Sequence, residues 1–163
     1  MPRNSQLAPR DGPDDLREFI ADLFAAAAGM QALRRAIGKS VGLGSMELAI
    51  LLALWRMRPR SDVGIKFLAE HLHVAGPHIT DEVSRLVRRK YLLKAADPLD
   101  KRAVNLRLTG KALALLGAVA PNLDKINAHL FEGVTARDFQ ILRSSFQRLI
   151  LRSASAKDLL ESE

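Results

Sequence analysis

Polar side chains that can form directed hydrogen bonds are concentrated in one short stretch near the middle of the chain. The polar members are His78, Thr80, Asp81 and Ser84, and a basic cluster of Arg85, Arg88, Arg89 and Lys90 follows at once. Imidazole and hydroxyl groups can donate to or accept from base edges, a carboxylate can accept from a cytosine amino group, and cationic groups can bind phosphates. The stretch therefore has the chemistry of a nucleic-acid contact, and the alternative is a solvated helix end.

Two short helices are expected to position this stretch. Apolar residues at helical spacing predict one helix over residues 65–72 and a second that turns Ile79, Val83 and Leu86 inward. Between them, residues 74–77 read as a turn, in which Gly76 begins the second helix and Pro77 suits its first turn. In a helix-turn-helix the second helix enters the major groove, so we expect Gly76 and Pro77 to lie in the DNA-contacting set.

A β-hairpin is expected to follow. Residues 91–96 and 103–108 are two short runs, the second of which alternates cleanly, and a charged loop separates them. Lys101 and Arg102 would lie at the tip, where an arginine can enter the minor groove. Asp100 would repel phosphate, so its expected role is to hold Arg102 or the loop backbone in place. Asp97 and Pro98 are expected to set the turn.

The charge distribution agrees with this interpretation. Residues 56–111 contain thirteen Lys and Arg against six Asp and Glu, whereas the rest of the chain has twelve of each. The net charge of +7 is therefore confined to one third of the chain. A positive field on one module is the footprint expected for a polyanionic partner.

Amphipathic helices are expected on both sides of this module. We predict a flexible arm over residues 1–12, a dimerisation helix over 13–44, a winged helix-turn-helix over 45–111 and C-terminal dimerisation helices over 112–163. Within them, Ser45 should open a buried helix, Thr109 should cap a helix bent at Pro121 and ended by Gly133, and Thr135 with Asp138 should form a capping box. A two-fold homodimer would bury the long apolar stripes, and the alternative is packing within one subunit.

Several function classes are disfavoured by composition. The chain has no cysteine, which removes disulfides and thiolate chemistry. It also lacks a signal-like apolar segment, a glycine-rich phosphate loop and a nucleophile elbow, so a cytoplasmic protein without catalysis or cofactor is expected. His71, His73 and His78 are close in sequence, but the first two point to different sides of a helix, and no metal site is expected.

The central segment resembles the MarR family of bacterial transcription regulators. The resemblance rests on Leu68-Ala69-Glu70-His71-Leu72 with its following turn, and on residues 97–111, in which Asp100 and Arg102 precede Leu108-Thr109. It covers about residues 14 to 152. It implies a mainly α fold with a small β-hairpin wing, a triangular homodimer joined by terminal helices, and a near-palindromic DNA operator. Arg102 then matches the family's wing arginine and Asp100 its supporting aspartate.

Three positions depart from the family pattern. Gly76 and Asp81 stand where the family often has basic residues, and Lys90 stands where a glycine often precedes the wing strand. Operator sequence and affinity therefore cannot be transferred from relatives.

Many proteins of this family are repressors released by small aromatic or acidic ligands, and a homodimeric regulator of this kind is the function that the resemblance implies. An apolar cleft with a cationic group could lie near the end of the first helix; its candidate residues are Arg34, Arg35, Lys39, Met46, Trp55 and Arg56. The competing interpretation places Met46 and Trp55 in the core. The alternatives to the ligand-released repressor are a constitutive or architectural DNA-binding protein without an effector, and a winged helix that binds protein instead of DNA.

Overall fold

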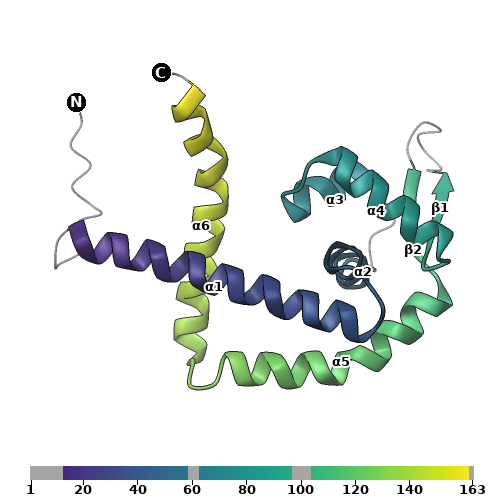
Figure 1. Cartoon of the computed structure of the whole chain (residues 1–163), viewed down its shortest axis with the longest axis horizontal. Helices are drawn as coiled ribbons and strands as arrows, with labels where there is room; N and C mark the ends of the chain where they lie inside the picture. The colour runs from purple at the N-terminus through teal and green to yellow at the C-terminus, as the bar shows by residue number, and fades with distance from the viewer. Residues whose placement is uncertain (1–12, 59–62, 97–103, 162–163) are drawn as a thin grey trace. The chain divides into compact units, whose positions relative to one another are not determined.

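A computed structural model describes residues 13–58, 63–96 and 104–161. Its elements, in chain order, are α1 (Pro13–Ser40), α2 (Ser45–Arg56), α3 (Ile65–Leu72), α4 (Gly76–Arg88), β1 (Leu92–Ala96), β2 (Val104–Leu108), α5 (Gly110–Leu130) and α6 (Ala136–Glu161). The two strands pair with each other in one small sheet. The predicted fold class, mainly α with a helix-turn-helix followed by a β-hairpin, is confirmed (Figure 1).

Contacts divide the chain into two compact units, Met1–Ala118 and Val119–Glu163. The boundary falls inside α5, so the first unit contains α1 to β2 with the beginning of α5, and the second contains the rest of α5 and α6. The division into a 13–44 dimerisation helix, a 45–111 winged module and 112–163 dimerisation helices stays a prediction, because dimerisation itself is not tested by these contacts.

Helix α2 is the centre of the first unit. It contacts α1, α3, α4 and β2, and Figure 1 shows it end-on among them. Leu48, Ile50 and Leu51 are fully buried there, which agrees with the nearly continuous apolar sequence of this helix. Burial of these side chains on several sides of α2 fixes how the surrounding helices and the hairpin are held.

The connection between α1 and α2, residues 41–44, is a tight corner. The N–H groups of Val41 and Leu43 both donate to the carbonyl of Gly38, at 3.1 and 2.8 Å. Gly42 has a φ of 69°, a left-handed conformation that glycine adopts without strain. Helix α2 begins at Ser45, as expected, with Gly44 as its N-cap, and the hydroxyl of Ser45 accepts a hydrogen bond from Arg34 Nε at 3.0 Å.

The hairpin is joined to the helices by backbone hydrogen bonds. Its register pairs Leu92 with Leu108 and Ala96 with Val104. The segment before α3 extends this small sheet, since Gly64 forms a bridge with Asn105 and the N–H of Leu106 donates to the carbonyl of Val63 at 2.9 Å. Strand β2 is therefore held on both sides. After it, the Thr109 hydroxyl accepts the N–H of Ala112 at 3.2 Å, which confirms the predicted cap of α5.

The second unit begins within α5 and ends with α6. Thr135 and Asp138 form the predicted capping box, in which the Thr135 hydroxyl accepts the N–H of Asp138 at 3.2 Å and the Asp138 carboxylate accepts the N–H of Thr135 at 3.3 Å. Gly133 lies in the turn between the two helices with a φ of 80°. Pro121 lies inside α5, and the bend expected there stays a prediction.

Within the described residues, no single helix is long and apolar enough to cross a membrane. Helices α1 and α2 taken together have the length and apolar composition of a membrane span, but they are bent by 89° at their junction.

Candidate nucleic-acid interface

The turn between α3 and α4 fixes the orientation of the predicted contact helix. His73 ends α3 in the left-handed conformation, with a φ of 53°, and the N–H of Val74 donates back to the carbonyl of Ala69 at 3.0 Å. Helix α4 then begins at Gly76, as expected, with Pro77 in its first turn. The side chains of Ile79, Val83 and Leu86 are fully buried, so the opposite face of α4 is directed to solvent.

The solvent face of α4 carries the predicted base-edge residues. Pro77, His78, Thr80 and Asp81 are exposed and Ser84 is half-buried. The Thr80 hydroxyl donates to the carbonyl of Gly76 at 3.0 Å, and the Ser84 hydroxyl donates to the carbonyl of Thr80 at 2.8 Å. In this conformation both hydroxyls offer acceptor lone pairs outward, alongside the Asp81 carboxylate. The face is thus rich in acceptors, which suits cytosine and adenine amino groups in a major groove.

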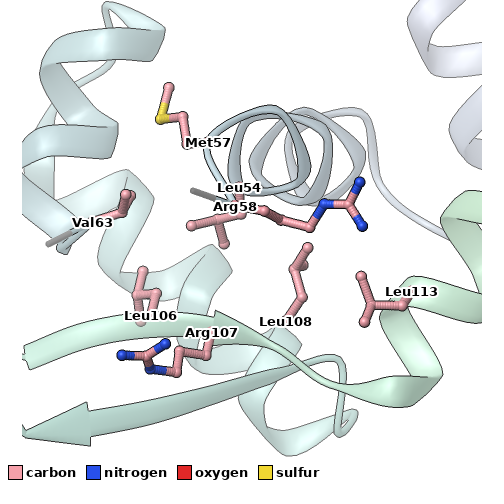
Figure 2. Close-up of a pocket in the computed structure, with 8 residues that line it drawn as sticks. All are labelled: Leu54, Met57, Arg58, Val63, Leu106, Arg107, Leu108 and Leu113. Carbon is pink, nitrogen blue, oxygen red and sulfur yellow. The ribbon is translucent and has the colours of Figure 1, made fainter. Parts of the chain in front are cut away.

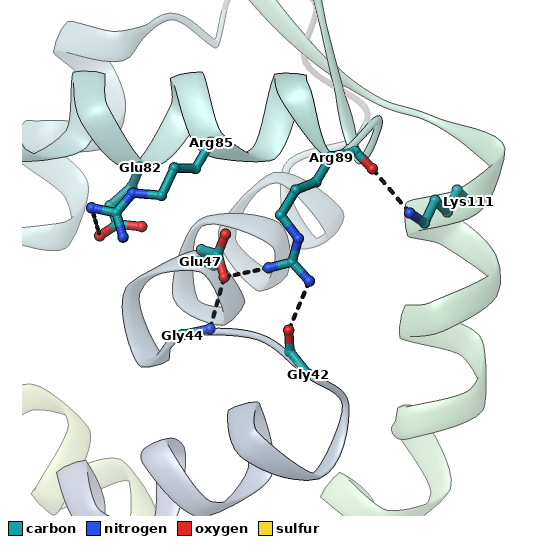
Figure 3. Close-up of polar contacts among 7 residues, drawn as sticks. All are labelled: Gly42, Gly44, Glu47, Glu82, Arg85, Arg89 and Lys111. Atoms are coloured by element: carbon teal, nitrogen blue, oxygen red, sulfur yellow. Dashed lines mark hydrogen bonds and ion pairs between the residues drawn. The ribbon is translucent and has the colours of Figure 1, made fainter.

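The basic residues that follow are not equivalent. The side chain of Arg88 is exposed and makes no hydrogen bond or ion pair with any other described residue. Arg85 lies 3.4 Å from the carboxylate of Glu82, which is buried, while Arg85 itself is half exposed. Arg89 lies against the α1–α2 corner, where both of its terminal nitrogens donate hydrogen bonds (Figure 3). The side chain of Arg88 is therefore available at this end of α4, whereas those of Arg85 and Arg89 are paired within the protein.

The turn from α4 into β1 is held by side chains from three elements. Arg89 Nη1 donates to Glu47 Oε2 at 2.8 Å and Nη2 donates to the carbonyl of Gly42 at 2.7 Å. On the other side of the turn, Lys111 Nζ donates to the carbonyl of Arg89 at 2.9 Å (Figure 3). Lys90, which stands where the MarR family often has a glycine, has a φ of 62° and so lies in the left-handed region that non-glycine residues seldom adopt.

The predicted wing tip lies outside the described residues. Lys101, Arg102, the supporting Asp100 and the turn residues Asp97 and Pro98 all fall in the segment 97–103. The strands that carry this tip are described, and Asn105 and Leu106 of β2 are buried. Minor-groove contact by Arg102 therefore stays a prediction.

The residues predicted for an effector cleft have different environments. Arg34 is held by Ser45, Arg35 and Arg56 are exposed, and Met46 and Trp55 pack against the hydrophobic core. The competing interpretation of Met46 and Trp55 as core residues is the one that their packing favours.

A cavity of about 240 Å³ lies elsewhere in the first unit, and none of those predicted residues lines it. It is formed at the end of α2, beside β2 and the first turn of α5; its lining residues are Leu54, Met57, Arg58, Val63, Leu106, Arg107, Leu108 and Leu113. Figure 2 shows an apolar cluster from these elements with the two arginines extending in opposite directions. Arg58 Nε donates to the carbonyl of Trp55 at 3.1 Å, so this guanidinium is held near the cavity.

His71 lies near the end of α3, close to two other positively charged groups. Partial burial lowers the pKa of His71 from 6.5, and the positive charges of Arg56 and His73 lower the pKa further. Its ring stacks on Phe67, with centroids 6.1 Å apart. Among the described residues, His71, His73 and His78 do not combine with acidic groups into a metal-ligand cluster.

Sequence reasoning missed the partners of Arg89 and the lining of the cavity. Glu47 lies in the first turn of α2, and an acid in an otherwise apolar helix is itself a signal for a buried ion pair. Gly42 and Lys111 carry no local signal for their contacts, because the pairing with Arg89 spans 47 and 22 residues of sequence. Arg58 and Arg107 were counted in the basic module without a specific role.

Comparison with solved structures places this geometry among known folds. A transcription regulator MarR from Oenococcus oeni PSU-1 is similar with a TM-score of 0.72 and 20% identity, over 81% of this chain and 98% of that one. A MarR/EmrR family regulator from Acinetobacter sp. ADP1 has a TM-score of 0.73 and 18% identity, over 85% and 96%. S. aureus MepR, solved as a complex with DNA, has a TM-score of 0.70 and 15% identity, over 80% and 92%.

No family model matches the sequence, and no curated protein is significantly similar to it. The identities to the solved structures are low, and what they share with this chain is the fold. The resemblance noticed in the sequence is confirmed at that level, since the fold is shared over 81% and 85% of this chain with the regulators from Oenococcus oeni PSU-1 and Acinetobacter sp. ADP1.

Proposed function

We propose that this protein is a cytoplasmic, homodimeric transcription regulator that binds duplex DNA through α4 and the hairpin, and that it is a repressor released by a small acidic or aromatic ligand. The observation that carries the proposal is the orientation of α4. Its apolar residues Ile79 and Val83 are fully buried, while His78, Thr80 and Asp81 are exposed at the N-terminal end that enters the major groove in this class of fold.

Charge supports the same assignment. The +7 net charge lies within residues 56–111, and Arg85 and Arg88 continue the exposed face of α4 beyond its polar residues. Cationic side chains beside the base-reading positions would bind phosphates and set the register of the helix on DNA. The fold shared with MepR, a protein solved as a DNA complex, supports the same mode of binding.

The test is the affinity of the purified protein for DNA from its own upstream region and for a random duplex, measured by fluorescence anisotropy at two salt concentrations. Tighter, salt-dependent binding to the upstream DNA is the expected result. Equal, salt-sensitive binding to both duplexes would favour the architectural alternative. Binding to neither would contradict the DNA assignment and leave a protein-binding winged helix.

Variants separate specific contacts from bulk charge. Arg88→Gln should weaken binding to both duplexes and lower the slope of log affinity against log salt by about 1, as expected for one lost phosphate contact. Arg17→Gln is the matched control, since Arg17 is an exposed arginine of α1 paired with Asp14. Arg102→Ala should weaken operator binding without changing the fold of the dimer.

The proposed dimer rests on exposed apolar side chains of α1 and α6. In α6, Phe139, Leu142, Phe146 and Leu149 follow helical spacing and are each 42–47% exposed. In α1, Phe24 is 71% exposed. Such stripes are costly in water unless a partner covers them. Light scattering should give the mass of a dimer for the wild type, a smaller mass for Phe146→Glu, and no change for Gln140→Glu on the same helix.

For the effector we propose the cavity of Figure 2 as the site, and a small carboxylic acid with an apolar body as the ligand class. Its volume of about 240 Å³ is below that of drug-sized sites, six of its eight lining residues are apolar, and Arg58 supplies a cation. A ligand there would contact β2, the strand that carries the wing.

A panel of aromatic acids such as benzoate and naphthoate would test this site by release of bound DNA. Leu113→Trp, which fills the cavity, and Arg58→Gln should abolish the response without abolishing DNA binding. Arg35→Gln is the comparison variant, because loss of response in it alone would place the effector near the end of α1.

A further inference from the structure

Arg89 connects the end of α4 to the α1–α2 corner. Its guanidinium donates to Glu47 Oε2 at 2.8 Å and to the carbonyl of Gly42 at 2.7 Å, so two elements far apart in sequence are joined by one side chain (Figure 3). The same Glu47 oxygen accepts the N–H of Gly44 at 2.8 Å. The carboxylate thus holds the first turn of α2 and the C-cap residue of α4 together.

Burial makes this ion pair difficult to break. The side chain of Glu47 is 6% exposed, whereas that of Arg89 is 39% exposed. If Arg89 turned outward to a phosphate, it would leave a carboxylate buried without its cationic partner, which is strongly unfavourable. Arg88, one residue earlier, has no such partner among the described residues and is free to turn outward.

The other side of Arg89 is held by α5. Lys111 Nζ donates to the Arg89 carbonyl at 2.9 Å, and Lys111 also lies 4.2 Å from the centroid of the Tyr91 ring. The Arg89 guanidinium lies 5.3 Å from the centroid of the same ring. The end of α4 is therefore fixed between the α1–α2 corner and α5, and both cations lie close to the same aromatic ring.

We propose that Arg89 is a positioning residue for DNA binding: through Glu47 and Gly42 it sets the angle at which the exposed face of α4 is presented, and it does not itself bind phosphate. The inference rests on the proposed DNA-binding function. It assigns the phosphate contact of this helix end to Arg88, because Arg85 is, like Arg89, paired with a buried carboxylate, that of Glu82 at 3.4 Å. It also gives the buried Glu47 a role in DNA affinity although this carboxylate is not exposed to the DNA.

The effect of Glu47→Gln on DNA affinity distinguishes a positioning Arg89 from a phosphate-binding one. Glu47→Gln makes the protein more positive by one unit, so a freed, phosphate-binding Arg89 would tighten DNA binding and steepen its salt dependence. A positioning role predicts the opposite result, in which Glu47→Gln weakens binding despite the added positive charge. Loss of one charge-assisted hydrogen bond corresponds to about a tenfold change in affinity.

The experiment is a double-mutant cycle on DNA affinity at several salt concentrations, with urea unfolding to confirm that each variant is folded in the assay. Glu47→Gln and Arg89→Gln should each weaken binding about tenfold, the double variant should be no weaker than the weaker single variant, and the salt slope should not change. Arg88→Gln is the matched control and should lower that slope by about 1. If Glu47→Gln does not fold, Arg89→Lys takes its place in the test. This variant keeps the positive charge but loses the paired donors, so an intermediate loss of DNA affinity is expected.

Each outcome decides the proposal. Tighter binding by Glu47→Gln, or a lower salt slope for Arg89→Gln, would overturn it while DNA binding itself stands. If the wild type binds no duplex, the proposed function fails, and amide hydrogen exchange then tests the positioning role alone. Faster exchange of residues 85–91 in Glu47→Gln and Arg89→Gln, with α3 unchanged, would support it, and unchanged exchange there would refute it.

Discussion

Replacing Gly38 by alanine would test the packing of the α1–α2 corner on which Arg89 depends. A Cβ at Gly38 would lie 2.8 Å from the carbonyl oxygen of Leu43 and 3.3 Å from that of Gly44. Both are backbone atoms, and the N–H of Leu43 is already bonded to the Gly38 carbonyl at 2.8 Å. No side-chain rotation can relieve this contact, so the corner itself must move.

Two opposing effects set the sign of the change in stability. Alanine in place of glycine favours a helix interior by roughly 0.5–1 kcal/mol. An extra carbon forced into a packed site costs about 1–3 kcal/mol. Because the closest contact of the new Cβ is with rigid backbone, we expect the steric cost to dominate and Gly38→Ala to lower the free energy of unfolding by about 1 kcal/mol.

The assay is urea unfolding followed by far-ultraviolet circular dichroism at one protein concentration, so that any dimer contributes equally. Gly29→Ala is the matched control in the same helix, and Gly117→Ala is a second control in α5, since no atom lies within 4 Å of either new Cβ. Both controls should raise stability by roughly 0.5–1 kcal/mol. Gly38→Ala should also weaken DNA binding, since Gly44 and Glu47 would shift with the corner.

The reasoning would be refuted if Gly38→Ala were as stable as the two controls. That result would mean that the corner relaxes without cost and that its position is not closely fixed. Reduced stability with unchanged DNA affinity would instead mean that the packing of the corner does not determine how α4 is oriented for DNA binding.

Three further predictions follow from single positions. Lys90→Gly should stabilise the protein by about 1 kcal/mol in the same unfolding assay, because Lys90 has a φ of 62°, a conformation that costs a non-glycine residue energy. A destabilised variant would show that the lysine side chain contributes more to stability than its backbone conformation costs. Gly76→Arg should tighten DNA binding and raise the salt slope by about 1, since a Cβ at Gly76 meets no atom within 4 Å; Gly76→Ala is the control, and equal affinities would count against a phosphate near the start of α4. The pKa of His71 is lowered below 6.5, mainly by burial and further by the charges of Arg56 and His73. The unfolded state therefore binds the proton more strongly than the folded state, and stability should fall as the pH decreases from about 7.5 to 5.5. His71→Gln should reduce that fall in urea midpoint, and an identical pH profile would show that other groups cause it.

Short-range patterns in the sequence were sufficient to predict the elements of this protein. The Thr135–Asp138 capping box and the Thr109 cap each join residues three apart, and the structure contains both. The apolar spacing of α1 and the alternation in β2 likewise depend on the period of one helix or strand. With the turn before Pro77, these patterns predicted the winged helix-turn-helix and the exposed face of α4.

The tertiary structure decided which partners those elements bring together. Arg89 and Glu47 are 42 residues apart, and the sequence placed Arg89 with the DNA contacts because nothing local distinguishes it from Arg88. Ser45 has the side chain of an N-cap, but Arg34 of the neighbouring helix binds its hydroxyl. The lining of the cavity comes from α2, β2 and α5, and no one segment encodes it. Local periodicity reports which face of an element is buried, whereas the partner across that face depends on how separate elements pack around α2.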